Sequence, residues 1–64
     1  MNDYMKGKVE TCLELCSSAN DFENKVKLVT GLTTSGFDNM ECLVKAKEMM
    51  TTGIDKRIII RSCF

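Results

Sequence analysis

The chain has 64 residues, with 9 Lys and Arg against 9 Asp and Glu and no His, so its formal net charge is zero. A chain this short buries only about 60% of the surface that it exposes when unfolded, which favours one small domain over residues 1–64 and leaves little scaffold for a deep catalytic cleft. The absence of His removes the commonest general base and the commonest metal ligand. Zero net charge argues against non-specific binding to nucleic acids or membranes.

The compartment and the state of the cysteines follow from the start of the chain and from cysteine spacing. The first residues are polar, and no apolar run long enough for a secretory signal or a membrane span follows them. We therefore expect a cytoplasmic protein with reduced thiols. The pair Cys12 and Cys16 is followed by isolated cysteines at Cys42 and Cys63, which does not match the paired ligands of zinc sites. We expect no metal and no cofactor.

Residues 8–16 fit two structures. A strand places Val9, Leu13 and Leu15 on one face, whereas a helix gathers one stripe of Met5, Val9, Cys12, Leu13 and Cys16. Gly7 weakens a helix interior, and the polar run Ser17–Asp21 is typical of a hairpin loop, so we favour the strand. The strand separates Cys12 from Cys16 by about 13 Å, whereas a helix places them about 6 Å apart. A bond between these two cysteines would exclude the strand.

The next segment, residues 24–32, also alternates and is predicted to be a second strand. Its first face carries Val26, Leu28, Thr30 and Leu32, and its second carries Lys25, Lys27 and Val29. The glycine-containing stretch at 31–36 then connects it to a helix.

The clearest predicted element is a helix at 38–52. Asp38 and Glu41 form a capping-box pattern, Phe37 can pack back on the first turn, and Gly53 stands where a left-handed residue ends a helix. Its apolar stripe consists of Cys42, Leu43, Ala46, Met49 and Met50.

The C-terminal segment, residues 56–63, is predicted to be a third strand because it holds a β-branched triplet between two arginines. Ile58 and Ile60 lie on one face of this strand, and Arg57, Ile59 and Arg61 lie on the other.

These elements predict an α+β fold of the order ββαβ, an antiparallel three-stranded sheet with one helix packed on one face. The alternatives are αβαβ, or an all-α fold with a helical N-terminal third. The predicted core comprises Val9, Leu13, Leu15, Val26, Leu28, Leu32, Phe37, Cys42, Leu43, Ala46, Met49, Met50, Ile58 and Ile60.

The sheet face that the helix leaves uncovered is the predicted contact surface for a partner. It carries Lys25, Lys27, Arg57, Ile59 and Arg61. The sequence offers no general base to deprotonate a cysteine thiol, and no carboxylate has a His partner. We therefore expect no catalytic residues and no enzyme activity. We predict a protein-binding module that contacts a host or cellular protein and can also form a homo-oligomer. The alternative is a small nucleic-acid-binding protein that uses the same basic face.

Residues Phe37–Met50, together with Gly53 and Arg57–Arg61, resemble small bacteriophage-encoded cytoplasmic proteins over about residues 25–62. That resemblance implies an accessory factor that occludes a surface of a host protein, in the style of anti-restriction and anti-CRISPR inhibitors. It supplies no catalytic residue. Two slighter resemblances are to sterile alpha motif domains, at Gly36–Glu41 and Met50–Asp55, and to insect Ly6-type domains, at Arg57–Cys63. In this chain the segment between the two matching stretches is too short for a sterile alpha motif domain. The signal peptide and most of the disulfide framework of Ly6-type domains are missing.

Overall fold

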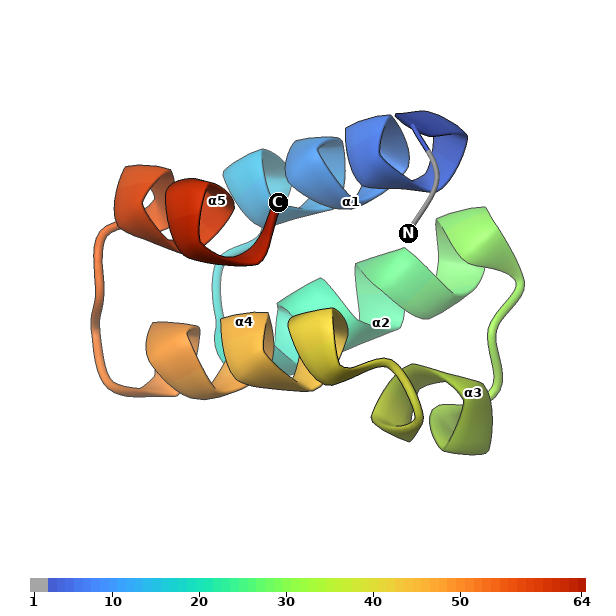
Figure 1. Ribbon diagram of the computed structural model, residues 1–64. Coiled ribbons are helices and arrows are strands. Elements are labelled where there is room, and N and C mark those ends of the chain that lie inside the picture. Colours follow the sequence, from blue (N-terminus) through green and yellow to red (C-terminus); the bar gives the residue numbers. More distant parts are fainter. Residues whose placement is uncertain (1–2) are drawn as a thin grey trace.

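The computed structural model describes residues 3–64, and this part of the chain folds into five α-helices without a strand (Figure 1). The helices are α1 (Asp3–Leu15), α2 (Ala19–Thr30), α3 (Thr34–Asp38), α4 (Glu41–Thr51) and α5 (Lys56–Cys63). The predicted ββαβ sheet is therefore wrong, as is the αβαβ alternative. The all-α alternative with a helical N-terminal third describes the fold.

Helix α1 replaces the strand predicted at 8–16. Its buried side chains are Val9, Cys12 and Leu13, and Cys16 is buried directly after its end, so the apolar stripe of the helical alternative faces the core. Burying a side chain as large as Leu13 contributes about 1.5–3 kcal/mol. This outweighs the roughly 1 kcal/mol that Gly7 costs inside a helix.

Helix α2 replaces the strand predicted at 24–32, and polar residues define both of its ends. The Ser18 side chain accepts a hydrogen bond from the Asp21 N–H (3.1 Å), and the Asp21 carboxylate accepts one from the Ser17 N–H (3.0 Å). Gly31 closes the helix with a left-handed φ of 74°. The run predicted to be a hairpin loop is thus a helix start, because the Ser18 hydroxyl satisfies a free N–H group of the first turn and the Asp21 carboxylate fixes the residue before the cap.

Helix α4 confirms a helix within 38–52, but it begins later than predicted. Asp38 belongs to α3, and Met40 precedes α4 without a side-chain cap, so the predicted capping box does not form. The predicted end is confirmed: Gly53 has a φ of 81°, and its N–H donates to the Met50 carbonyl at 3.0 Å. The Ile54 N–H donates to the Met49 carbonyl at 3.1 Å, which completes a Schellman motif.

Helix α5 replaces the strand predicted at 56–63. The Asp55 carboxylate caps it by accepting a hydrogen bond from the Arg57 N–H at 2.8 Å. Ile59 is fully buried, whereas 52% of Ile58 is exposed, which reverses the faces that the strand assigned to them. β-Branched residues cost a helix well under 1 kcal/mol each, so burial of one isoleucine exceeds that preference.

The helices surround a core to which α2 is central, since α2 packs against α1, α3 and α4, while α5 covers α4 and α1 (Figure 1). The rings of Phe22 and Phe37 meet edge to face with centroids 6.2 Å apart. The buried core consists of Val9, Cys12, Leu13, Cys16, Phe22, Val26, Phe37, Leu43, Ala46 and Ile59. No helix within residues 3–64 has both the length and the apolar character needed to cross a membrane.

Six residues of the predicted core are buried, and five more pack partly buried against it. The buried six are Val9, Leu13, Val26, Phe37, Leu43 and Ala46. The partly buried five are Leu32, Cys42, Met49, Met50 and Ile60. The prediction is wrong for Leu15, Leu28 and Ile58, which are exposed. All three errors have one cause. The strand interpretation places every second side chain on the same face, whereas in a helix the side chains of one face recur every three or four residues.

Candidate functional site

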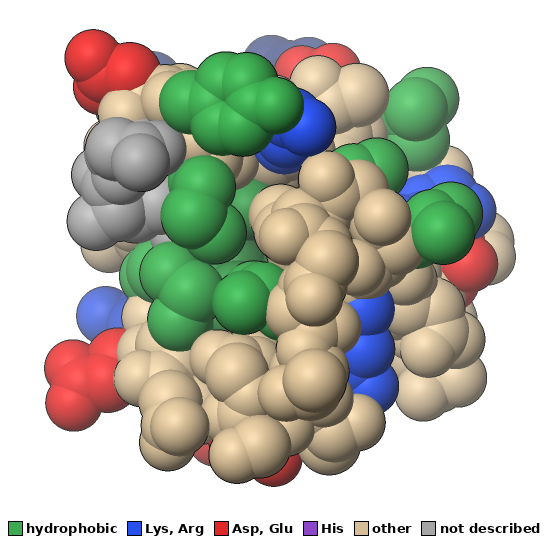
Figure 2. Space-filling model, turned by 90° about the vertical axis from the view of Figure 1, so that its right-hand side faces the viewer, with side chains coloured by type: hydrophobic (Ala, Val, Ile, Leu, Met, Phe, Trp, Pro, Cys, Tyr) green, Lys and Arg blue, Asp and Glu red, His purple; other side chains and the backbone are tan. Residues whose placement is uncertain are grey.

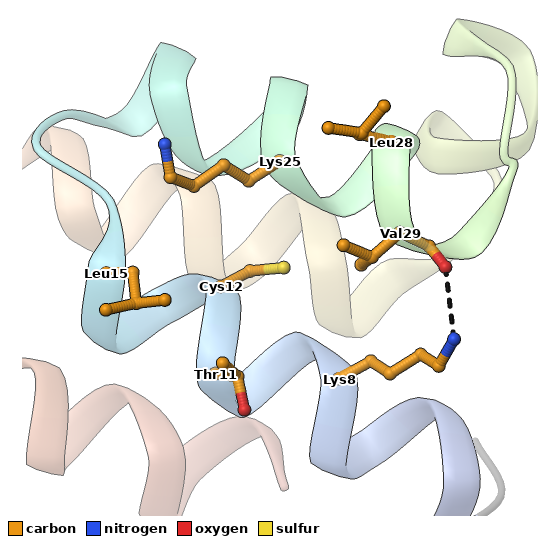
Figure 3. Close-up of a pocket in the computed structure, with 7 residues that line it drawn as sticks. All are labelled: Lys8, Thr11, Cys12, Leu15, Lys25, Leu28 and Val29. Carbon is orange, nitrogen blue, oxygen red and sulfur yellow. Dashed lines mark hydrogen bonds between the residues drawn. The ribbon is translucent and has the colours of Figure 1, made fainter.

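An open groove of about 450 Å³ runs between α1 and α2 (Figure 3). Each helix contributes residues spaced three or four apart, which therefore share one helix face. The side chains that line it are Lys8, Thr11, Cys12, Leu15, Lys25, Leu28 and Val29. Figure 2 views the end of the molecule where α1 begins and α2 ends, and there hydrophobic side chains gather at the surface.

The walls of the groove are unusually apolar for an exposed surface. Leu28 is 84% exposed, Leu15 is 69% exposed and Val29 is 42% exposed. Covering apolar surface stabilises an assembly by about 25 cal/mol per Å², so these three side chains favour contact with another apolar surface.

The Cys12 thiol lies within the groove, on the α1 side (Figure 3). Its residue is 4% exposed, and burial raises the pKa of this thiol, with a further increase from the nearby Cys16. Because a thiol with a raised pKa stays protonated at neutral pH, Cys12 behaves as an apolar lining group rather than as a nucleophile.

Two lysines border the groove at opposite ends (Figure 3). The Lys8 ammonium donates to the Val29 carbonyl at 3.3 Å and lies 4.5 Å from the centre of the Tyr4 ring. The Lys25 ammonium pairs with Asp21 at 3.0 Å, one helical turn earlier. The Ser17 N–H and this lysine together hold the pKa of the Asp21 carboxyl below its usual value. The groove is thus apolar along its length and positively charged at both ends.

The predicted contact residues do not form one surface. Lys25 and Lys27 lie on α2, whereas Arg57, Ile59 and Arg61 lie on α5, and α2 and α5 do not pack together. Ile59 is fully buried, so its assignment as a contact residue is wrong.

The four basic residues of the predicted surface have different surroundings. Lys27 pairs with Glu23 at 2.7 Å and donates to the Thr34 hydroxyl at 2.8 Å. Arg57 and Arg61 are exposed on α5. Of the five, Lys25 lines the groove.

A second surface feature lies on the outer side of α4. A shallow hollow of about 430 Å³ there is lined by one apolar residue, Val44, and by four charged residues, Asp38, Glu41, Lys45 and Glu48. Three carboxylates against one ammonium give this hollow a net negative charge. Val44 is recognisable in the sequence as a surplus apolar residue beside the main stripe of its helix, but the acidic residues around it were not predicted to form a site.

The sulfur atoms lie in pairs around the core, and all four cysteines are free thiols. The Cys16 Sγ is 3.7 Å from the Met50 Sδ, and the Cys63 Sγ is 4.0 Å from the Met49 Sδ. Burial raises the pKa of both thiols. Within residues 3–64, no group of three or more His, Cys, Asp or Glu side chains is arranged to hold a metal ion.

Comparison of the chain with protein-family models, with curated proteins and with solved structures returned no match in any of the three. The resemblances named from the sequence therefore stay predictions. Sequence reasoning missed the groove because the strand interpretation placed Leu15 and Leu28 in the core. A helical projection of residues 8–15 and 25–29 puts the groove residues of each segment on one face, and that is the signal that could have found them.

Proposed function

We propose that this chain is a non-enzymatic protein-binding module and that its binding site is the groove between α1 and α2. The observation that carries the proposal is the exposure of Leu15, Leu28 and Val29 along one groove. Small globular proteins seldom leave large side chains grouped in this way unless another molecule covers them. The groove takes the place of the basic sheet face expected from the sequence.

The shape and charge of the groove define the chemistry of its partner. A groove between two helices accepts an amphipathic helix, whose apolar residues recur at every third or fourth position. Lys8 and Lys25 at its two ends favour carboxylates on that helix. The partner segment is therefore helical, apolar on one side and acidic at its margins. Occlusion of such a segment is the mode of action expected of a modulator or inhibitor of another protein.

The nucleic-acid alternative loses the surface on which it depended. Its basic sheet face does not form, because Lys25 and Lys27 lie on α2 and Arg57 and Arg61 lie on α5, a helix that does not pack against α2. Phosphate contacts would also require a steep loss of affinity with salt, whereas an apolar groove with two flanking charges gives a shallow one.

Selection of helical peptides from a displayed random library on the immobilised full chain tests this function. We expect the selected peptides to carry apolar residues at spacings of three or four together with Asp or Glu. Leu28→Glu should weaken binding of a selected peptide by at least about tenfold. Ile58→Glu is the matched control, because Ile58 is also an exposed aliphatic residue but lies on α5. Equal binding to the wild type and to Leu28→Glu, or no enrichment of any peptide, would contradict the proposal.

A further inference from the structure

The hollow on α4 is opposite in charge to the two ends of the groove. The groove presents a protruding apolar side chain, Leu28, which is 84% exposed, with Lys25 one turn before it on α2. The hollow presents a recess around Val44 with Glu41 and Glu48 on either side along α4. A protruding leucine beside an ammonium group can contact Val44, the one apolar residue that lines the hollow, while the ammonium group approaches the carboxylates around it.

The groove and the hollow lie on opposite sides of the molecule. In the view onto the groove, the ribbon of α4 passes behind α2 (Figure 3). The buried residues of α4, Leu43 and Ala46, face the core. The four α4 residues that line the hollow lie on the opposite side of this helix; they are Glu41, Val44, Lys45 and Glu48. Two surfaces on opposite sides cannot close a two-fold dimer, and a contact between them continues from one molecule to the next.

Charge also disfavours Ile58, the most exposed aliphatic side chain outside the groove, as an occupant of the groove. Ile58 on α5 lies next to Arg57 and one turn before Arg61. These arginines would approach the lysines that border the groove, and like charges brought together oppose association. The acidic hollow around Val44 meets the same lysines with opposite charge.

Building on the proposed function, we propose that a partner of the groove is α4 of a second copy of this chain. Leu28 of one copy inserts into the hollow at Val44 of the next, while Lys8 and Lys25 approach the carboxylates of Asp38, Glu41 and Glu48. The assembly is a head-to-tail chain. Lys25 exchanges part of its contact with Asp21 for this contact between copies.

The small surface of the molecule limits the area that this contact can bury, and with it the affinity between copies. A standard interface covers about 800 Å² on each partner, which is roughly a fifth of the 4059 Å² accessible surface of one copy. One helix face against one groove belongs at the lower end of interface sizes. Association should therefore appear at micromolar to millimolar concentration and weaken as salt screens the flanking charges.

Sedimentation of the full chain tests this inference over concentrations on the order of 10 µM to 1 mM. The variants are Leu28→Glu, which removes the protruding side chain, and Val44→Lys, which fills the hollow, with Ile58→Glu as control. We expect the average mass of the wild type and of the control to rise with concentration, while each of the other two variants stays monomeric. An equimolar mixture of Leu28→Glu and Val44→Lys should give a 1:1 dimer, because each retains the surface that the other lacks. Far-ultraviolet circular dichroism of each variant checks that the helices remain.

Three results would overturn the inference. They are a wild type that stays monomeric throughout, association that survives both substitutions, and variants that remain monomeric when mixed. The first result leaves the proposed function standing if selected peptides still bind the wild type and lose affinity for Leu28→Glu. If no peptide binds either, both proposals fail.

Discussion

Glu23 of α2 and Lys47 of α4 form an ion pair between helices, with the Lys47 Nζ 2.5 Å from the Glu23 Oε1. The second carboxylate oxygen of Glu23 accepts from Lys27 at 2.7 Å, and only 12% of the Glu23 side chain is exposed. Hydrogen bonds from Lys27 and then from Lys47 hold the pKa of this carboxyl below its ordinary value. One carboxylate thus links the central helix to α4, the helix that carries the acidic hollow.

The first prediction concerns the acid stability that this ion pair provides. Because the pKa of Glu23 is lower in the folded state, its stabilisation is complete above the ordinary pKa of 4.5 and is lost as the pH falls through the folded value. Glu23→Gln should lower the free energy of unfolding by about 1 kcal/mol at neutral pH. Urea denaturation of both proteins from neutral to acid pH should show that difference shrinking as the carboxyl is protonated. A difference that stays constant with pH would contradict the assignment, and Glu14→Gln at an exposed position is the control.

The second prediction uses two adjacent isoleucines on α5. Ile59 is fully buried and Ile58 is 52% exposed. Ile59→Ala should reduce the free energy of unfolding by about 2–4 kcal/mol, because it opens a cavity in the core. Ile58→Ala should change it by under about 1 kcal/mol. Thermal or urea denaturation of the two variants makes the comparison, and a larger effect at Ile58 than at Ile59 would contradict the packing of α5 through Ile59.

The third prediction compares two glycines in different backbone conformations. Gly53 has a φ of 81°, whereas Gly7 lies inside α1, where a methyl group added at its Cα would meet no neighbouring atom within 4 Å. Gly53→Ala should destabilise the protein by about 1–2 kcal/mol, because L-residues are strained in the left-handed region. Gly7→Ala should stabilise it by about 0.5–1 kcal/mol by removing freedom of the unfolded chain. Opposite signs in melting temperature are the expected result, and equal signs would contradict one of the two backbone assignments.

Capping residues carried more information about this fold than residue propensity did. Ser18 with Asp21, Gly31 and Asp55 each mark a helix end, and all are legible in the sequence. The strand interpretation instead followed the β-branched triplet at 58–60 and the alternation at 24–32. Short amphipathic segments satisfy periods of 2 and 3.6 residues almost equally well, so hydrophobic pattern alone could not decide between them.

The candidate site was predictable only in part for the same reason. The sequence predicts Lys25 as a contact residue, and Lys25 does line the groove, but it also predicts Leu15 and Leu28 in the core, where they do not lie. Whether a leucine is buried in the core or exposed in the groove depends on which helix packs beside that leucine. The spacing of residues within one segment does not contain that information.

Local sequence was enough to predict the left-handed glycine at the end of α4 and six of the ten buried residues, because these depend on local backbone conformation and on apolar character. The remaining features depend on how the helices pack. Packing buried Ile59 instead of Ile58, placed Glu23 between two lysines, and left Leu28 outside the core, since α4 covers one side of α2 and α1 covers only part of the other. The free energy of burial is a property of the assembled helices, and it exceeded the weaker strand preference of each segment.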